Sequence, residues 1–243
     1  MVGDEGRKRR KVALDRPTAT VVGTTLCLQS ALVLTGIASA RLLGPESRGW
    51  LALAAAIPVA ISGIALLGFP SAVTYEVARG RDSGFESLRL IRGWVTVQLL
   101  VATVASLAIS AVLFRDAPGS IGPWIVVVGF ATALLAGYQY LMAILQGRGK
   151  FGDFNQARAT LTLVYALWVG VLLFAVSKPS ALLFAWGWAL GAAVAVANSW
   201  RLARRGDPRE KLGGADAKFI RSYGLRSFLG VRPPLETLNL DQL

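Results

Sequence analysis

The chain has 243 residues, of which 54% are hydrophobic and only 16% are charged, whereas soluble domains usually carry about 25% charged residues. It contains no histidine and one cysteine, Cys27, which excludes intrachain disulfides, zinc sites built from Cys and His, and Ser-His-Asp triads. The formal net charge of +12 suits nucleic acid or anionic lipid as a partner, unless the distribution of the basic residues has another cause.

Six long segments are nearly free of charged residues. Each has about the length of 20 residues that a helix needs to cross a hydrocarbon core roughly 30 Å thick. A soluble core would instead show polar residues every few positions. We therefore predict an all-α integral membrane protein, a bundle of about six transmembrane helices over residues 18–40, 50–75, 93–114, 121–146, 159–177 and 180–200.

These segments divide the chain into a basic tail (1–17), a six-helix transmembrane lobe (18–200) and a second basic tail (201–243). The tails and alternate connectors hold all but four of the 26 Lys and Arg residues, the exceptions being Arg41, Arg48, Arg115 and Lys178. Because short connectors rich in Lys and Arg stay in the cytoplasm, both ends are predicted to be cytoplasmic. Topology thus explains the basic excess, and we expect no nucleic-acid partner.

The first apolar segment has an alternative interpretation. A basic stretch, an apolar run and the small residues 38–40 before Arg41 resemble a cleavable signal peptide, and residues 9–10 resemble a weak twin-arginine signal. The run is about 23 residues long, however, whereas the apolar core of a signal peptide typically has about 7–15 residues. The length favours an uncleaved first helix.

Two charged stretches have the pattern of amphipathic helices that lie on an anionic cytoplasmic leaflet. Residues 83–86 read SGFE, with the spacing of a capping box, and Asp216 is placed to cap a second helix that carries Phe219, Ile220 and Tyr223. Within the apolar segments, stripes of small residues predict close helix packing. The stripes are Ala52, Ala56 and Ala60, and Gly187, Gly191, Ala195 and Ser199.

Four short motifs occur in the order found in a known family of membrane proteins. Residues 40–49 read ARLLGPESRG, residues 68–72 read GFPSA, residues 146–151 read QGRGKF ahead of Asn155, and residues 223–227 read YGLRS. With these motifs the chain resembles the N-terminal lobe of the polysaccharide and oligosaccharide flippases, in the multidrug/oligosaccharidyl-lipid/polysaccharide flippase superfamily. Residues 232–234, which read RPP, depart from the apolar helix start that the family has there.

The resemblance implies a bacterial cytoplasmic-membrane location and a cargo. In the family, a polyprenyl-diphosphate-linked glycan moves between two helical lobes, from the cytoplasmic to the external leaflet. This chain would supply one lobe, so we expect a truncated, frameshifted or half-size member that does not transport alone and needs a second lobe. Two alternatives stay open: a non-transporting membrane subunit that docks on glycan-assembly enzymes, and a membrane enzyme. We favour no enzymatic activity, and expect no cofactor and no metal.

The candidates for the substrate path are polar side chains inside the apolar segments, with membrane lipid around them. Arg41 ends the first segment externally, where by the resemblance it would attract a diphosphate. The alternative is a snorkelling interfacial arginine. No acid or base lies in the middle of a segment, and the remaining path candidates are Gln29, Gln98, Gln139 and Asn198.

The second apolar segment contains several residues that bend helices. Pro58, Gly63, Gly68 and Pro70 are expected to kink it, as a flexible or a static bend. At its cytoplasmic end, Glu76 is expected to pair with Arg79 or to face water.

Overall fold

The computed structural model describes residues 16–80, 84–205 and 217–231, which form helices and no strand. Five of the helices are long and apolar enough to cross a membrane, which confirms the prediction of an all-α, multi-pass membrane protein. The elements are α1 (Arg16–Ala65), α2 (Phe69–Ala78), α3 (Phe85–Leu90), α4 (Arg92–Leu113), α5 (Ile121–Gly147), α6 (Phe151–Ala175), α7 (Ala181–Arg204) and α8 (Ala217–Val231).

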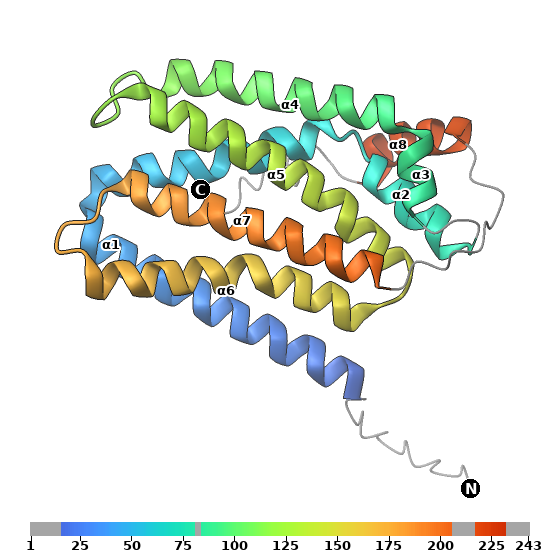
Figure 1. Ribbon diagram of the computed structural model, residues 1–243, viewed down its shortest axis with the longest axis horizontal. Coiled ribbons are helices and arrows are strands. Elements are labelled where there is room, and N and C mark those ends of the chain that lie inside the picture. The colour runs from blue at the N-terminus through green and yellow to red at the C-terminus, as the bar shows by residue number, and fades with distance from the viewer. Residues whose placement is uncertain (1–15, 81–83, 206–216, 232–243) are drawn as a thin grey trace, which may run out of the picture.

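Helix α1 consists of two arms joined at Gly44. The backbone of Gly44 has φ 72° and ψ 175°, a conformation that glycine adopts readily because it lacks a Cβ. The apolar part of α1, Gly23–Ala65, has 43 residues and would be about 65 Å long if straight, twice a hydrocarbon core. Figure 1 shows that the chain reverses direction here, so arm 1 (residues 23–43) and arm 2 (residues 45–65) run antiparallel.

The predicted second segment, residues 50–75, is not one helix. Arm 2 ends at Ala65 and α2 begins at Phe69, with left-handed backbone at Leu67 (φ 46°) and Gly68 (φ 70°) between them. Pro70 lies in the first turn of α2, where a proline lacks only an N–H that would have had no helical partner. The kink predicted around Gly68 and Pro70 is therefore a complete break in the helix.

Helix α5 lies in the middle of the bundle and packs against α1, α2, α4 and α7 (Figure 1). Helices α6 and α7 extend past their predicted apolar segments, because α6 already begins at Phe151 and α7 continues to Arg204. These additional turns carry charged side chains, which hydropathy excludes from a span although the helix continues through them.

The stripe of small residues on α7 packs closely against α6, as predicted. Gly187, Gly191, Ala195 and Ser199 are all buried. A Cβ on Gly187 would lie 1.9 Å from Cδ1 of Trp168, and one on Gly191 would lie 3.0 Å from the carbonyl oxygen of Leu161. The expectation for arm 2 is wrong for Ala52, which is exposed, whereas Ala56 and Ala60 are half-buried. The fully buried face of this arm carries Ala54 and Ile57.

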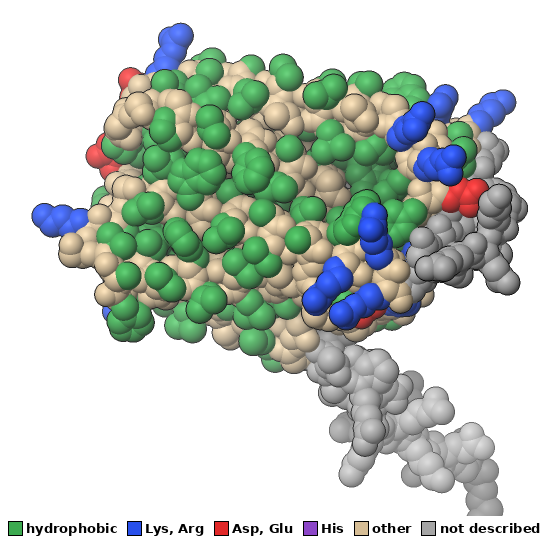
Figure 2. Space-filling model, in the orientation of Figure 1, with side chains coloured by type: hydrophobic (Ala, Val, Ile, Leu, Met, Phe, Trp, Pro, Cys, Tyr) green, Lys and Arg blue, Asp and Glu red, His purple; other side chains and the backbone are tan. Residues whose placement is uncertain are grey.

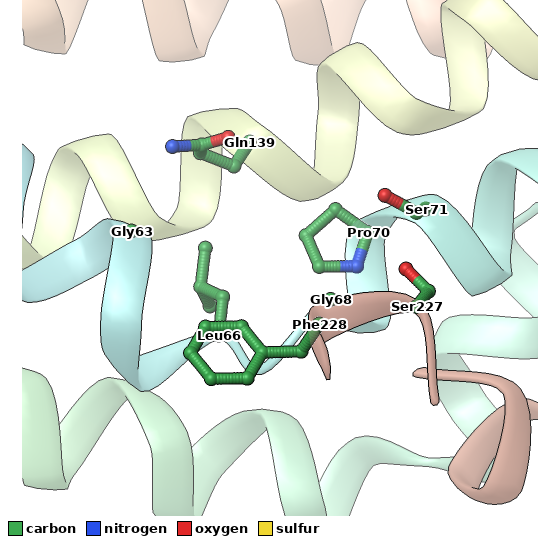
Figure 3. Close-up of a pocket in the computed structure, with 8 residues that line it drawn as sticks. All are labelled: Gly63, Leu66, Gly68, Pro70, Ser71, Gln139, Ser227 and Phe228. Carbon is green, nitrogen blue, oxygen red and sulfur yellow. The ribbon is translucent and has the colours of Figure 1, made fainter. Parts of the chain in front are cut away.

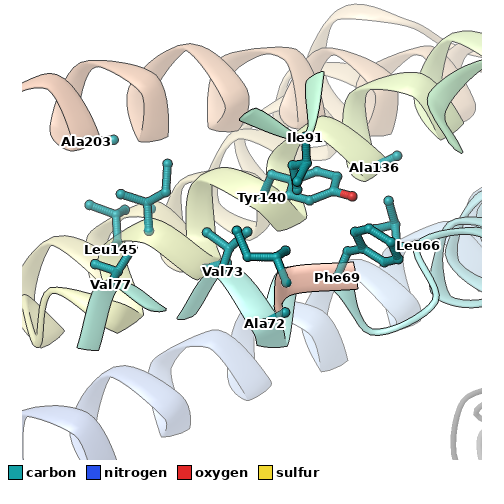
Figure 4. Packing of buried hydrophobic residues seen from close by; sticks show 14 of the residues in the cluster. Leu66, Phe69, Ala72, Val73, Val77, Ile91, Ala136, Tyr140, Leu145 and Ala203 are labelled. Carbon is teal, nitrogen blue, oxygen red and sulfur yellow. The ribbon is translucent and has the colours of Figure 1, made fainter. Parts of the chain in front are cut away.

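The largest buried cluster lies where α2, α5, α7 and α8 meet, and Figure 4 shows Tyr140, Phe69 and Leu145 within it. On the outside, large apolar side chains are exposed along the flanks of the bundle; Phe174 is 93% exposed. Figure 2 shows these hydrophobic side chains across the flank and most of the visible Lys and Arg at the end that holds α2 and α3. We call this the basic end.

Helix α8 packs across α2 at the basic end. Ile220 is fully buried, and the ring of Tyr75 stacks on Tyr223 and Phe219 with centroids 4.9 and 5.7 Å away. The apolar face that the sequence assigned to lipid therefore contacts α2. In the other predicted amphipathic helix, now α3, Gly84 is the N-cap; Ser83 and Asp216 lie outside the described residues.

Candidate functional site

A polar cleft of about 310 Å³ opens between α2, α5 and α6 near the basic end. A smaller pocket of about 60 Å³ adjoins it and shares Pro70, Ser71 and Gln139. Figure 3 shows Gln139 of α5 on one side of this pocket and Phe228 of α8 on the other. The residues that line the larger cleft are Pro70, Ser71, Thr74, Tyr138, Gln139, Met142, Ala143, Gln146, Phe154 and Arg158.

The break between arm 2 and α2 positions one wall of the cleft. Because α2 restarts at Phe69, Ser71 and Thr74 fall in its first two turns. The hydroxyl of Thr74 lies 3.1 Å from the carbonyl oxygen of Pro70 and 3.2 Å from that of Ala143, and so it can donate to α5. On α5, a Cβ on Gly147 would lie 2.7 Å from the carbonyl oxygen of Thr74, so the two helices touch at the end of the cleft.

Arg158 supplies the positive charge of the cleft. Its side chain is exposed on α6, it is the single cation among the lining residues, and no carboxylate is among them. Hydroxyl and amide groups of Ser71, Tyr138 and Gln139 share the lining with it. This combination provides hydrogen-bond partners for a polar group and a guanidinium for an anion, within helices that are otherwise apolar.

Of the five path candidates from the sequence, Gln139 alone lines the cleft. Gln98 is buried; its Nε2 donates to the carbonyl oxygen of Leu66 at 3.2 Å, and its Oε1 accepts from the hydroxyl of Tyr140. It therefore satisfies the backbone at the helix break. Asn198 joins α7 to α6, because its Nδ2 donates to Oγ1 of Thr160 at 2.9 Å.

The two candidates on arm 1, Gln29 and Arg41, are exposed and lie outside the cleft. Arg41 instead lines a separate groove together with Arg48. The five residues therefore do not form one continuous path. A polar residue type inside an apolar segment indicates a special position, but it does not indicate which way around the helix the side chain points.

Several lining residues were missed in the sequence. Arg158 was counted only as a topological charge, although it lies two helical turns into α6, directly before the apolar segment 159–177. Ser71 belongs to the GFPSA motif, but no separate role was predicted for its side chain. The expectation that Glu76 faces water is wrong, since its side chain is fully buried.

No family model, curated protein or solved structure matches the chain. Among the described residues, no group of three or more His, Cys, Asp and Glu side chains is arranged to hold a metal ion.

Proposed function

We propose that this chain is a lobe of a lipid-linked glycan flippase in the bacterial cytoplasmic membrane, with six passes through the bilayer and both ends in the cytoplasm. Two lines of support are independent of each other. The order of the motifs ARLLGPESRG, GFPSA, QGRGKF and YGLRS resembles that family. The polar cleft opens near the basic end, which the distribution of Lys and Arg assigns to the cytoplasm.

The cleft would reduce the main free-energy cost of moving a glycan across a bilayer, which is the transfer of its polar groups into hydrocarbon. A sugar hydroxyl or a phosphate that enters hydrocarbon without partners loses several kcal/mol per group, and more if charged. Gln139, Ser71 and Thr74 offer hydrogen bonds to sugar hydroxyls, and Arg158 offers a charge to the diphosphate. The cargo would thus enter from the leaflet in which lipid-linked glycans are assembled. This cleft is the observation that carries the proposal.

The helix break beside the cleft supports alternating access. Leu67 and Gly68 interrupt the helix, so α2 is not bound to arm 2 by a continuous hydrogen-bond ladder. Helix α8 packs on α2, and Gly68 touches Gly224. The pair α2 and α8 would tilt about residues 66–68 to open or close the pocket, as hinges at the ends of elements do. A second lobe would supply the opposite wall.

Export in living cells tests the proposal with whatever second lobe the cell contains. In a strain that lacks the chain, the lipid-linked glycan should accumulate in the cytoplasmic leaflet while surface glycan falls. We expect Arg158→Gln to lower export about tenfold, the worth of one charge-assisted hydrogen bond. Arg89→Gln is the control, because Arg89 is exposed at the same end of the bundle on α3 and does not line the cleft.

Two outcomes would contradict the flippase proposal. If precursor and surface glycan are both unchanged without the chain, it has no role in export. If the precursor is no longer synthesised, instead of accumulating, the chain belongs to the assembly machinery as a non-transporting subunit. Both quantities can be measured by mass spectrometry of extracted lipids and by surface glycan staining.

A further inference from the structure

A second concave surface lies on arm 1, at the other end of the bundle from the cleft. It is a groove of about 640 Å³, and its floor is one face of arm 1. Positions spaced by three or four residues share a helix face, which explains why these particular residues come together. Arg41 and Arg48 stand at one end of the groove, and the floor consists of Leu32, Val33, Gly36, Ile37 and Ala40.

The floor has the length and the polarity of a lipid chain. From Leu32 to Arg41 the helix rises about 14 Å, close to half of a hydrocarbon core of roughly 30 Å. The groove therefore extends over the depth of one leaflet. Leu32, Val33 and Ile37 are 46%, 59% and 47% exposed, so the floor is open to an apolar ligand from the side.

The charge at the end of the groove identifies the head group. Arg41 and Arg48 are two of only four basic residues outside the basic end and the tails, and both are exposed. No carboxylate lines the groove. Glu46 lies between Arg41 and Arg48 in the sequence, but it lines a different groove with Trp50 and Leu53. Two guanidinium groups over an apolar floor complement a phosphate group attached to an alkyl chain.

We propose that this groove binds an anionic phospholipid of the external leaflet, with one acyl chain along residues 32–40 and the phosphate at Arg41 and Arg48. A lipid-linked glycan fits it less well, because no hydroxyl or amide side chain lines the groove to bind sugars, whereas the cleft between α2, α5 and α6 has several. The proposed lipid site does not depend on glycan transport, but it rests on the same orientation in the membrane as the proposed function. In this site the guanidinium of Arg41 would pair with the lipid phosphate, whereas Arg41 lies outside the cleft.

Photolabelling of the full chain in nanodiscs tests the site. The discs contain phosphatidylcholine and a small fraction of a probe, either phosphatidylglycerol or phosphatidylcholine, with a diazirine on its acyl chain. Peptide mass spectrometry then measures labelling of residues 32–41. We expect the phosphatidylglycerol probe to label this peptide more strongly, and Arg41→Gln and Arg48→Gln each to lower that preference about fivefold, the worth of one basic side chain near an anionic lipid.

Matched variants separate the site from general effects of charge and packing. The pair Arg115→Gln and Lys178→Gln removes the other two cations that the described residues place at this end, and it should leave the labelling unchanged. Gly36→Leu should abolish it, because a Cβ there meets no protein atom within 4 Å and the new side chain would fill the groove. Gly23→Leu, on the same helix with equally open space, should have no effect.

Four results would overturn the lipid site. The first is equal labelling by the two probes, and the second is an equal loss with the Arg115 and Lys178 pair. The third is unchanged labelling in Gly36→Leu when the variant elutes as wild type from a sizing column. The fourth is displacement of the phosphatidylglycerol probe by a polyprenyl diphosphate at an equal concentration, which would assign the groove to the cargo path instead.

Discussion

At the scale of single residues, the polar side chains inside the helices have two different roles. Gln139 lines the cleft, whereas Gln98 and Asn198 hold helices to each other. The sequence identified all three by the same property, a polar side chain in an apolar segment. It could not distinguish them, because the role depends on which neighbour faces the side chain, and Tyr140 and Leu66 are distant from Gln98 along the chain.

Replacing Gln98 by alanine tests its structural role. The change leaves the carbonyl oxygen of Leu66 and the hydroxyl of Tyr140 without these hydrogen bonds in a buried place. We expect a loss of about 1 kcal/mol in unfolding free energy, in the range of polar contacts between membrane helices. The thermal unfolding midpoint in detergent measures it. Gln29→Ala, at an exposed site on arm 1, should unfold as wild type, and a similar loss in both would contradict the assignment.

The contact between Gly187 and Trp168 gives a larger expected effect. A methyl group at Gly187 would lie 1.9 Å from Cδ1 of Trp168, so the ring must move and the hydrogen bond from its Nε1 to the carbonyl oxygen of Leu183, 2.9 Å long, would break. We expect Gly187→Ala to lower the unfolding free energy by about 2 kcal/mol, a typical penalty for overpacking.

Gly170→Ala is the matched control for Gly187→Ala. Gly170 lies on α6, and an added Cβ there meets no atom within 4 Å, so the substitution should be neutral or slightly stabilising through helix propensity. Denaturation of both variants in mixed micelles compares them directly. Equal stabilities would show that α6 and α7 are less closely packed than the structure indicates.

At the scale of elements, hydropathy predicted where helices cross and missed where the backbone turns. The boundaries expected for residues 93–114 and 121–146 differ from α4 and α5 by a single residue, because apolarity and helix end together there. Residues 66–68 are as apolar as their neighbours, so the break between arm 2 and α2 changes the backbone without changing composition. Gly68 and Pro70 were the available signals, and they indicated a bend of unspecified size.

Gly68 and Gly80 lie just before and just after α2. Substitutions at these two sites distinguish the effect of backbone strain from the effect of the contact between α2 and α8. Gly68 and Gly80 both have positive φ, 70° and 67°, so alanine is strained at either site. At Gly68 the added Cβ would also lie 2.5 Å from the carbonyl oxygen of Gly224 in α8, whereas at Gly80 it meets nothing within 4 Å. Gly68→Ala should therefore displace α8 from α2, and Gly80→Ala should not.

Hydrogen–deuterium exchange of residues 217–231 in detergent reports this displacement. We expect faster exchange in Gly68→Ala than in wild type or Gly80→Ala, because α8 depends on α2 for burial of Ile220 and the stacking of Tyr223 on Tyr75. If both variants exchange equally fast, backbone strain at either end of α2 is sufficient to displace α8. The direct contact between Gly68 and α8 then makes no separate contribution to the packing of α8.

At the scale of the whole molecule, the asymmetry of charge was the most informative property of the sequence. Arm 1, arm 2 and helices α4 to α7 run alternately toward and away from the basic end (Figure 1), so connectors that are scattered in the sequence gather at two ends. The sequence could predict this alternation because each segment is long enough to cross once. It could not predict the cleft, because its walls come from α2, α5 and α6, which are distant from one another along the chain.

The orientation of this bundle in the membrane is the premise for both the cleft and the lipid groove, and cysteine accessibility tests it most directly. Single cysteines are introduced into Cys27→Ala at Arg115 and Lys178, at one end, and at Arg89 and Arg205, at the basic end, all exposed sites. We expect a membrane-impermeant maleimide to label the first pair in intact cells and the second pair only after permeabilisation. Labelling of Arg89→Cys and Arg205→Cys in intact cells, with Arg115→Cys and Lys178→Cys protected, would contradict the account.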